Sequence, residues 1–371
     1  MDGIFISSSP HFSSGLSTQK IMLAVIIALI PECAAGVYFF GLHALFVILT
    51  GIFSCVLFEF LFQAATRQNV TVSNLSAVVS GILLALVCPP TAPLWTVVLG
   101  SAVAMIVAKG IFGGIGSNVF NPALTGRAFL VISFPAAMGA RWYDPTLVPH
   151  IYEKLSAQGL STEQIDAMSQ ATVWDGITSA TVLSKVKTGA FQADAGSLWN
   201  LFIGNRGGCI GETSILMILI SFLFLFATRV IDWRAGVSMC LTVAAATLAS
   251  ALASGAQASA AFTEVLVALM TGGLLFGAVF MVTDYATSPV TSKGRLIFGA
   301  GCGLITFLIR KFGGYPEGVM FSILIMNAVA PFLNNLTSRK YGYGKKGNRR
   351  PEPKNIVQEF DVASAKTEVK E

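Results

Sequence analysis

The sequence is poor in charge and in histidine. Lys, Arg, Asp and Glu make up 12% of its 371 residues, and three residues are histidine. A soluble globular domain has about 25% charged residues, so the composition excludes a soluble enzyme with an added anchor. The formal net charge of +5 does not indicate nucleic-acid binding, because most of the surplus lies in the tail from Arg339 to Lys354.

The six cysteines offer neither a metal site nor a disulfide framework. They lie far apart, without a C-x-x-C pair and without a histidine at metal-ligand spacing. Five of them fall within or at the ends of apolar runs, where cysteine behaves as a small hydrophobic residue. Only Cys209 stands in a polar stretch. A cleavable signal peptide is also not expected, because residues 1–20 are polar and the first apolar run is long enough to span a membrane.

What the chain does contain is a series of apolar runs of about 20 residues, the length that crosses a bilayer. We therefore expect an all-α polytopic membrane protein with about ten transmembrane helices. The runs at 75–89 and 119–138 carry Pro, Gly and polar residues, and either could be a broken or partial helix. The ten predicted spans are 21–40, 44–63, 75–89, 94–112, 119–138, 213–231, 235–254, 262–282, 295–312 and 317–336.

Basic residues indicate how these spans are oriented. Every second connection is basic, whereas the connections 41–43, 88–93 and 254–259 contain no Lys or Arg. The positive-inside rule then places both termini in the cytoplasm and the long polar segment outside. Arg310 and Lys311 are the exception, near the outer end of the ninth span. The basic positions on the inner side are Lys20, Arg67, Lys109, Arg229, Arg234, Lys293, Arg295 and the tail.

The two groups of five spans resemble each other. Ser80-Gly81-Ile-Leu-Leu84 corresponds to Gly272-Gly273-Leu-Leu-Phe276, and Lys109-Gly-Ile-Phe-Gly-Gly114 corresponds to Arg310-Lys-Phe-Gly-Gly314. Because five is odd, the second copy must be inverted in the membrane, an arrangement typical of transporters. The predicted organisation is a cytoplasmic N-terminus (1–20), a first five-helix repeat (21–138), an extracytoplasmic loop (139–212), a second five-helix repeat (213–336) and a disordered basic cytoplasmic tail (337–371).

The extracytoplasmic loop contains the stretch Trp174-Asp-Gly-Ile-Thr-Ser-Ala-Thr181. Thr181 is a poor nucleophile, because no His or Cys stands nearby in sequence to activate it. Small neighbours would instead allow another enzyme to attach a group to its hydroxyl. The alternative is structural: Asp175-Gly176 forms a turn, and Thr178 or Thr181 caps a short helix through Lys185.

Three further features admit two interpretations each. Gly204-Asn-Arg-Gly-Gly208, just before Glu212-Thr213-Ser214, could cradle an anion at a helix start or could be a plain turn capped by Thr213 or Ser214. Asp284, among Thr283, Thr287 and Ser288, could hold a cation or could cap a helix end. Glu32 and Glu59 fall inside predicted spans, where acidic side chains usually have a function, unless they lie nearer the interface.

The order of several motifs resembles the NqrB/RnfD family, the membrane subunits of the sodium-pumping NADH:quinone reductase and of the Rnf electron-transport complex. The resemblance runs from about residue 9 to 337, and the short lead before the first span is more like RnfD. The motifs that carry it are Ser9-Pro-His11, Asn118-Val-Phe-Asn-Pro-Ala-Leu124, Gly126-Arg127, Gly211-Glu-Thr-Ser214 and Thr283-Asp-Tyr-Ala-Thr-Ser-Pro289.

This resemblance implies a covalent flavin mononucleotide (FMN), joined through its phosphate to Thr181 by a flavin transferase. The family motif is close to D-x-x-[ST]-G-A-T, and here Asp175, Thr178 and Ser179 precede Thr181, with Ser179 in place of the glycine. Lys185 and Lys187 could offset the phosphodiester charge or could simply be solvated. The flavin site would include Glu212 and Thr213, and a second, non-covalent flavin such as riboflavin is also compatible.

The resemblance further implies a function in the bacterial or archaeal inner membrane. The chain would be a subunit of an ion-translocating (Na⁺ or H⁺) ferredoxin:NAD⁺ oxidoreductase complex, relaying electrons between other membrane and peripheral subunits without catalysing the reaction alone. Asp284, Glu32 and Glu59 would be candidates for the ion path. The alternatives are an NqrB-like subunit of a quinone reductase and a non-redox channel or transporter on the same repeat.

Overall fold

The computed structural model describes residues 17–139, 182–187, 191, 194–255, 257–315 and 317–337. Within these residues the secondary structure is entirely helical. Five helices are long and apolar enough to cross a membrane, or six if one strongly bent pair is taken as a single span. The chain is therefore a multi-pass membrane protein, as its apolar runs predict.

The first half of the chain begins with two long helices followed by shorter ones. Ser17 caps the first helix by accepting a hydrogen bond from the Lys20 amide, and Asn121 caps the fifth, with Pro122 in its first turn. The elements are α1 (Thr18–Phe40), α2 (Leu42–Ala65), η1 (Val72–Asn74), α3 (Ser76–Leu86), α4 (Leu94–Ala102) continuing as the π-helix η2 (Val103–Gly110), α5 (Pro122–Ser133) and α6 (Pro135–Gly139).

Two short helices precede the second half, which again consists of apolar helices. The elements are α9 (Val182–Lys187), α10 (Ala195–Ile203), α11 (Ile215–Ala227), α12 (Trp233–Ala253), α13 (Ala258–Met270), α14 (Leu274–Phe276) continuing as the π-helix η3 (Gly277–Met281), α15 (Ser292–Phe312) and α16 (Val319–Thr337). The predicted run 262–282 is therefore not one straight helix: α13 and the α14–η3 segment meet at 60°.

Glycine allows the helices of each half to approach closely. A Cβ on Gly81 in α3 would lie 2.5 Å from the Gly51 carbonyl oxygen in α2, and one on Gly126 in α5 would lie 2.6 Å from that of Gly100 in α4. In the second half, a Cβ on Gly303 in α15 would lie 2.6 Å from the Met239 carbonyl oxygen in α12. Small residues serve this purpose in membrane helix pairs, where packing rather than water exclusion drives association.

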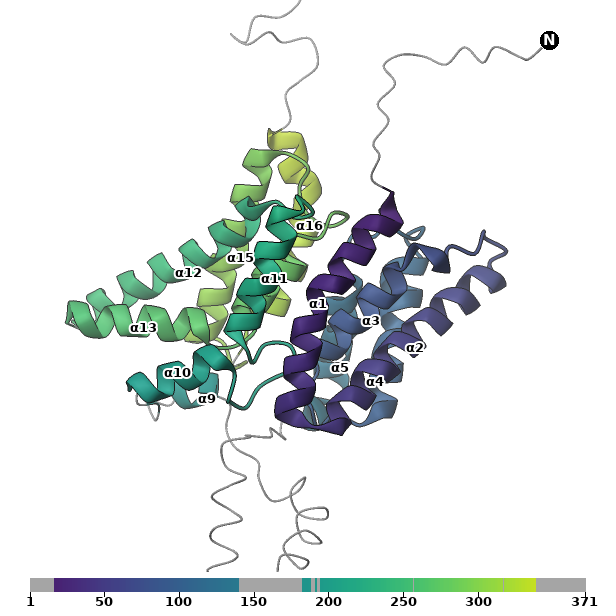
Figure 1. Cartoon of the computed structure of the whole chain (residues 1–371). Helices are drawn as coiled ribbons and strands as arrows, with labels where there is room; N and C mark the ends of the chain where they lie inside the picture. The colour runs from purple at the N-terminus through teal and green to yellow at the C-terminus, as the bar shows by residue number, and fades with distance from the viewer. Residues whose placement is uncertain are drawn as a thin grey trace, which may run out of the picture.

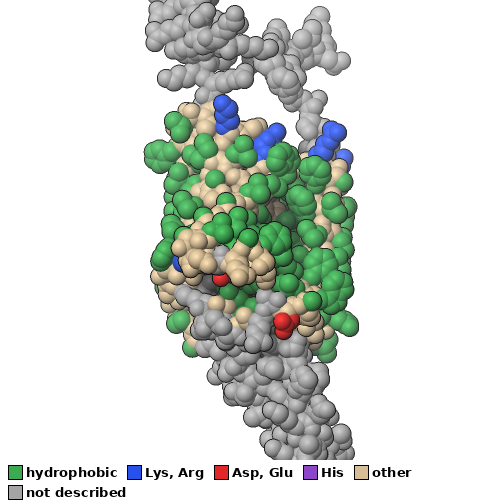
Figure 2. All heavy atoms as spheres, turned by 90° about the vertical axis from the view of Figure 1, so that its left-hand side faces the viewer, with side chains coloured by type: hydrophobic (Ala, Val, Ile, Leu, Met, Phe, Trp, Pro, Cys, Tyr) green, Lys and Arg blue, Asp and Glu red, His purple; other side chains and the backbone are tan. Residues whose placement is uncertain are grey.

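The two halves lie side by side and meet along α1 and α11 (Figure 1). The Ser221 hydroxyl of α11 donates to the Ala28 carbonyl of α1 at 2.6 Å, deep in this contact. The helix α1 begins and α16 ends at the same end of the molecule, while α9 and α10 lie toward the other end (Figure 1). Lys and Arg side chains gather at the former end above a wide apolar band (Figure 2).

Candidate functional site

The residues expected to carry the flavin lie largely outside the described part of the chain. This is the case for Asp175, Thr178, Ser179 and Thr181. The description resumes at Val182, where α9 begins, so the short helix of the structural alternative is present, while its predicted cap, Thr178 or Thr181, lies outside the described residues. The described residues near α9 define the polar contacts beside this helix.

The break between α13 and α14 frees backbone carbonyl groups that α13 can no longer satisfy. Two arginines from other elements cover them. Arg310, in the last turn of α15, donates to the carbonyls of Ala268 at 2.7 Å and Thr271 at 3.0 Å. Arg206, from the loop before α11, donates to the Met270 carbonyl. A cation at a helix C-terminus is doubly favourable, because it also compensates the negative end of the helix dipole.

Glu317, just before α16, caps the other side of the same break. Its Oε1 accepts the Gly273 amide at 2.7 Å, at the start of α14. Its Oε2 forms an ion pair of 2.9 Å with Arg127 of α5, which also donates to the Cys209 sulfur at 3.4 Å. Because Arg127 and Glu317 are 190 residues apart, this pair connects the two halves of the chain.

Glu212 points into this polar cluster rather than outward. Its Oε1 accepts the Cys209 amide at 2.9 Å, directly after the glycine-rich turn 204–208. Whether that turn also cradles an anion stays a prediction. The helix α11 is capped by Ser214, whose hydroxyl accepts the Met217 amide, and Thr213 is buried with its hydroxyl toward the Ile210 carbonyl. Cys209, expected in polar surroundings, is buried as well.

We call Arg127, Arg206, Glu212, Arg310 and Glu317 the break cluster. Its three guanidinium groups and two carboxylates leave one formal positive charge in excess. Burial lowers the pKa of Arg206 to about 10, which still leaves it charged at neutral pH. The carboxyls differ: burial, followed by the nearby charge of Glu317, raises the pKa of Glu212, whereas Arg127 and Arg310 outweigh burial and lower the pKa of Glu317.

The end of α3 is a second place where a short apolar helix leaves carbonyl groups unsatisfied. The Leu86 carbonyl accepts the Gly211 amide at 2.8 Å, and the Cys88 carbonyl accepts the Ile210 amide at 3.2 Å. The loop before α11 therefore covers both helix ends, one with backbone amides and the other with Arg206.

Helix α9 packs onto the break cluster. A Cβ built on Gly272, which has a φ of +67°, would lie 2.8 Å from Arg310 Nη2 and 3.2 Å from Leu183 Cδ2. Leu183 and the Arg310 guanidinium thus both lie against Gly272. Leu183, in the first turn of α9, is therefore beside the break cluster.

A separate cavity of about 460 Å³ opens between the two halves, near the end where α1 begins. Such a volume lies within the range of small-molecule sites, about 300–1,000 Å³. One wall comes from α1, α3 and the segment before α5, and includes Asn118 and Asn121. The opposite wall includes Asp284 and Ser288. The family motifs Asn118–Leu124 and Thr283–Pro289, distant in sequence, face each other across this space.

Asp284 both caps a turn and lines the cavity. Its carboxylate accepts the Thr287 hydroxyl at 3.1 Å and the Ala286 amide at 3.5 Å, and burial raises its pKa against these hydrogen bonds. The carboxylate therefore caps a turn between η3 and α15 rather than a helix end. Whether a cation also binds there stays a prediction.

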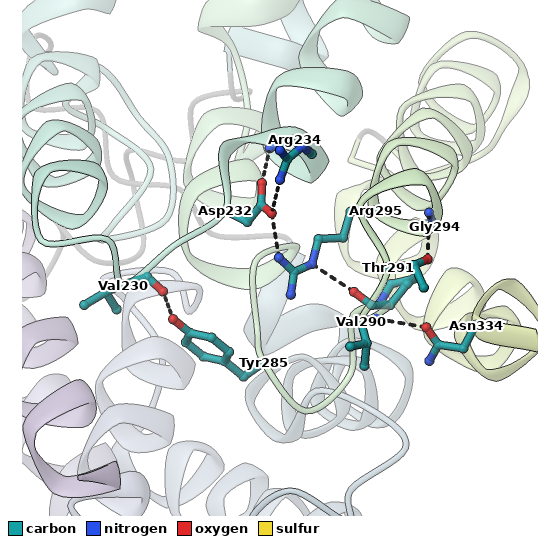
Figure 3. A network of polar contacts seen from close by, with 10 residues as sticks. Val230, Asp232, Arg234, Tyr285, Val290, Thr291, Gly294, Arg295 and Asn334 are labelled. Atoms are coloured by element: carbon teal, nitrogen blue, oxygen red, sulfur yellow. Dashed lines mark hydrogen bonds and ion pairs between the residues drawn. The ribbon is translucent and has the colours of Figure 1, made fainter. Parts of the chain in front are cut away.

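The segment 283–291 that carries Asp284 is fastened from three sides (Figure 3). Tyr285 donates its hydroxyl to the Val230 carbonyl, and Asn334 of α16 accepts the Val290 amide at 2.9 Å. Arg295 donates to the Pro289 carbonyl at 2.9 Å and to Asp232 at 2.6 Å. This wall of the cavity is consequently held by the connection between α11 and α12, by α15 and by α16.

Glu32 and Glu59, the other acidic residues predicted inside spans, are both buried but differ in their partners. Glu59 pairs with Lys109 at 2.7 Å, and Lys109 also donates to Ser76 at 2.7 Å. Lys109, expected among the basic residues of the inner side, is therefore buried. Glu32, 1% exposed in α1, keeps its Oε1 without a hydrogen-bond partner among the described residues.

Sequence reasoning missed the structural role of the break cluster. Arg127 stood in a family motif and Arg206 in the glycine-rich turn. Arg310 stood in the repeat match and as an exception to the charge pattern, while Glu317 was not singled out. The available signal was Thr271-Gly272-Gly273 inside an apolar run, which favours a helix break. A break in hydrocarbon requires polar partners from other elements, and the charges at the ends of neighbouring runs were the candidates.

Within the described residues, the geometry defines an all-helical membrane protein with a charge-capped helix break and a cavity between its halves, lined by apolar and polar side chains. The chain belongs to the NQR2, RnfD, RnfE family, whose sequence model matches residues 5–342.

Two relatives match nearly the whole chain at similar sequence identity. The chain is 39% identical to the D subunit of the proton-translocating ferredoxin:NAD(+) oxidoreductase complex of Clostridium ljungdahlii over 340 residues, 90% of this chain and 94% of the relative. It is 40% identical to the D subunit of the Na(+)-translocating ferredoxin:NAD(+) oxidoreductase complex of Acetobacterium woodii over 343 residues, 92% and 96% of the two chains.

Proposed function

We propose that this chain is the D subunit, a membrane component, of an Rnf-type ion-translocating ferredoxin:NAD⁺ oxidoreductase complex, and that it relays electrons between partner subunits. The observation that carries this proposal is the similarity to the D subunits of two such complexes over at least 90% of the chain. The chain would contribute an electron carrier rather than the complete reaction. The other subunits of the complex are its expected partners.

The electron carrier would be an FMN joined through its phosphate to Thr181 by a flavin transferase. A flavin accepts and donates one or two electrons, which suits a relay between dissimilar partners. The fit is supported by the described residues around α9: the break cluster has an excess of one positive charge, and the buried Nε of Arg310 has no hydrogen-bond partner there. An anionic group carried next to α9 matches both features.

Ten spans in two inverted repeats would complete the architecture. The helices α3, α4–η2, α5 and α11 are apolar but shorter than the five long ones, and counting them gives five spans in each half. Close packing of the second helix on the third through glycine occurs in both halves, by Gly51 with Gly81 and by Gly236 with Ala278. The basic end in Figure 2 supports cytoplasmic termini and an extracytoplasmic α9.

This orientation has a direct test. In a cysteine-free background, single cysteines at Gln158 and at Lys345 should react oppositely with an impermeant maleimide added to intact cells. Labelling at Gln158 alone supports ten spans with both termini inside. Labelling at Lys345 from outside would mean that the number of spans is odd.

Asp284, Glu32 and Glu59 stay our candidates for the ion path, and the cavity that Asp284 lines is our candidate site for a second, non-covalent flavin. Asp284 is the first to test, because its carboxylate lies on the cavity wall in a rigidly held segment. Asp284→Asn should leave the complex assembled and the covalent flavin attached but weaken ion-dependent activity. Normal ion transport in that variant would reduce Asp284 to a cap.

The attachment of FMN is tested by in-gel fluorescence. Thr181→Ala should abolish the ultraviolet-fluorescent band of the denatured chain, whereas Thr178→Ala and Ser179→Gly should retain it. Loss of one hydroxyl from the predicted extracytoplasmic loop should cost about 0.5 kcal/mol or less, so the variant should be produced normally. A band that survives in Thr181→Ala would place the acceptor elsewhere, and a wild-type chain without a band would favour a non-redox transporter.

A further inference from the structure

Glu32 of α1 is a carboxyl group that is buried without a partner for its charge. The residue is 1% exposed, and its Oε1 has no hydrogen-bond partner in the part of the chain that the structure describes. None of the described Lys, Arg or His side chains forms an ion pair with it. An ionised carboxylate without a partner is very costly to bury, so a carboxyl in such a place takes up a proton instead.

Glu32 differs in this respect from the other buried or half-buried acidic side chains that the structure describes. Each of the others accepts a hydrogen bond or forms an ion pair, which stabilises its negative charge. The partners are Lys109 for Glu59, Arg127 for Glu317, Arg234 and Arg295 for Asp232, the Thr287 hydroxyl for Asp284 and the Cys209 amide for Glu212.

The helices that pack against α1 provide no positive charge for Glu32. Neither α3 nor α11 contains an Asp, Glu, His, Lys or Arg, and the same is true of η1. The ionisable side chains of α2 are Cys55, Glu59, which is paired with Lys109, and His43, which bonds to the Pro90 carbonyl. On α1 itself, the titratable neighbour is Cys33, which supplies no cation either.

Glu32 also lies on the face of α1 that meets the second half of the chain. One turn before it, the Ala28 carbonyl accepts the Ser221 hydroxyl of α11 at 2.6 Å. One turn after it, a Cβ on Gly36 would overlap the Ile210 side chain, which belongs to the loop before α11. Residues four apart in a helix share a face, so position 32 stands between these two contacts.

We propose that Glu32 is a proton-binding site inside the membrane: its carboxyl holds a proton while α1 and α11 are in contact and exchanges it with water when they separate. The step is the addition of one proton to one carboxylate oxygen, and it moves no other charge. Pro31 cannot donate a helical hydrogen bond to the Ile27 carbonyl, which weakens α1 directly before this site. The role of this proton in the ion path rests on the function proposed above, and it assigns H⁺ to this residue.

Infrared spectroscopy of the purified full-length chain in lipid membranes tests the proposal without relying on activity. At neutral pH, the spectrum should contain the carbonyl stretching band of a protonated carboxyl in an apolar place. Glu32→Gln should remove this band and leave the carboxylate absorption unchanged, whereas Glu32→Asp should shift the band. The matched control is Glu264→Gln, which removes an exposed glutamate of α13 and should leave the band in place.

Exchange in heavy water tests whether the contact between α1 and α11 controls the proton. In the wild type, the band should shift to its deuterated position more slowly than the solutions mix. Ser221→Ala removes the hydrogen bond to Ala28, so it should speed this exchange by about 2- to 10-fold, the factor that loss of one hydrogen bond gives. Ser238→Ala is the control, because it removes a similar bond, from Ser238 to the Leu296 carbonyl, between α12 and α15.

Several outcomes would overturn the proposal. Loss of carboxylate absorption in Glu32→Gln, in place of the carboxyl band, would show that Glu32 is ionised. If Glu32→Gln does not fold, Glu32→Asp decides, and an unshifted band contradicts the proposal. Exchange that is complete on mixing, or equal in Ser221→Ala and Ser238→Ala, would remove the link to the contact between the halves. Failure of the proposed function is distinct, because it would show as a complex that moves no ions while the band persists.

Discussion

The two helix breaks of this protein face the same physical problem and solve it with different groups. At the end of α3, the carbonyls of Leu86 and Cys88 accept backbone amides of Gly211 and Ile210. At the α13–α14 break, the freed carbonyls accept guanidinium groups, and the Gly273 amide donates to a carboxylate. In an apolar environment either solution avoids the cost of an unpaired backbone group.

The difference is that only the second solution introduces charge. Backbone amides are neutral, so the carbonyls at the first break are covered by uncharged donors alone. The break cluster has an excess positive charge and two carboxyls with opposite pKa shifts. It is therefore the break that can respond to a charged cofactor, and it is also the one against which α9 packs.

The largest effect should come from breaking the ion pair that joins the halves. Glu317→Gln leaves Arg127 buried without its carboxylate and should destabilise the protein by about 3 kcal/mol or more. Thermal unfolding of the purified chain, followed by tryptophan fluorescence, measures the loss. Arg234→Gln is the control, because it breaks a pair with Asp232 whose arginine is more exposed, and surface pairs contribute about 1 kcal/mol or less. Equal effects would remove the distinction between the two pairs.

A smaller loss is expected when a cap is replaced rather than a charge pair broken. Arg206→Gln offers one amide to carbonyls that two guanidinium nitrogens now satisfy. One buried acceptor left without a partner should cost about 1–3 kcal/mol. The same unfolding measurement applies, and Arg206→Lys is the companion variant. A neutral result for both would show that water replaces the cap.

The break at the end of α3 is tested by adding a methyl group rather than by removing a charge. A Cβ added in Gly211→Ala would lie 2.6 Å from Leu86 Cβ and 3.2 Å from Phe276. Overpacking of this kind costs about 1–2 kcal/mol. Because the added methyl group is uncharged and clashes with apolar side chains, the loss should be the same at low and high salt, which repeated unfolding measurements can check. A salt-dependent loss would contradict the neutral character of this break.

The smallest effect concerns pH. The lowered pKa of Glu317 means that its stabilising contribution is present above the ordinary carboxyl pKa of about 4.3 and is lost as pH falls through its folded value. The raised pKa of Glu212 has the opposite sign: its contribution is present at low pH and is lost as pH rises through that value. Each slope is at most about 1.4 kcal/mol per pH unit.

Unfolding curves across pH separate the two contributions. Glu212→Gln should remove the decline at the higher pH, and Glu317→Gln should remove the loss in acid. Curves that change in the same direction for both variants would contradict the assignment of opposite shifts.

The helices could be predicted from the sequence because each corresponds to one continuous run of apolar residues. Twenty apolar residues need no partner to indicate a span, and the helix after Thr181 follows from its own cap signals. The break cluster could not be predicted in this way. Arg310 caps Ala268 over a separation of 42 residues, and Arg127 meets Glu317 over 190. The same holds for Glu59 and Lys109, which pair over 50 residues.

The pocket shows an intermediate case. The motifs around Asn118 and Asp284 were recognised as belonging together in one family, but nothing in their spacing shows that they form opposite walls of one cavity. The hydrogen bonds of Asp284 are local, to Ala286 and Thr287, although they close a turn rather than the predicted helix end. Its position on the cavity wall depends on the connection between α11 and α12, on α15 and on α16, which contact segment 283–291.

The loop before α11 also has a consequence for biosynthesis. The end of α3 obtains its partners from Ile210 and Gly211, more than a hundred residues later in the chain. During synthesis, the first half therefore enters the membrane with an open helix end that only the later chain can close. A nascent chain that stalls before residue 210 would display unsatisfied carbonyls at that end, a signal by which membrane quality control could distinguish unfinished copies from complete ones.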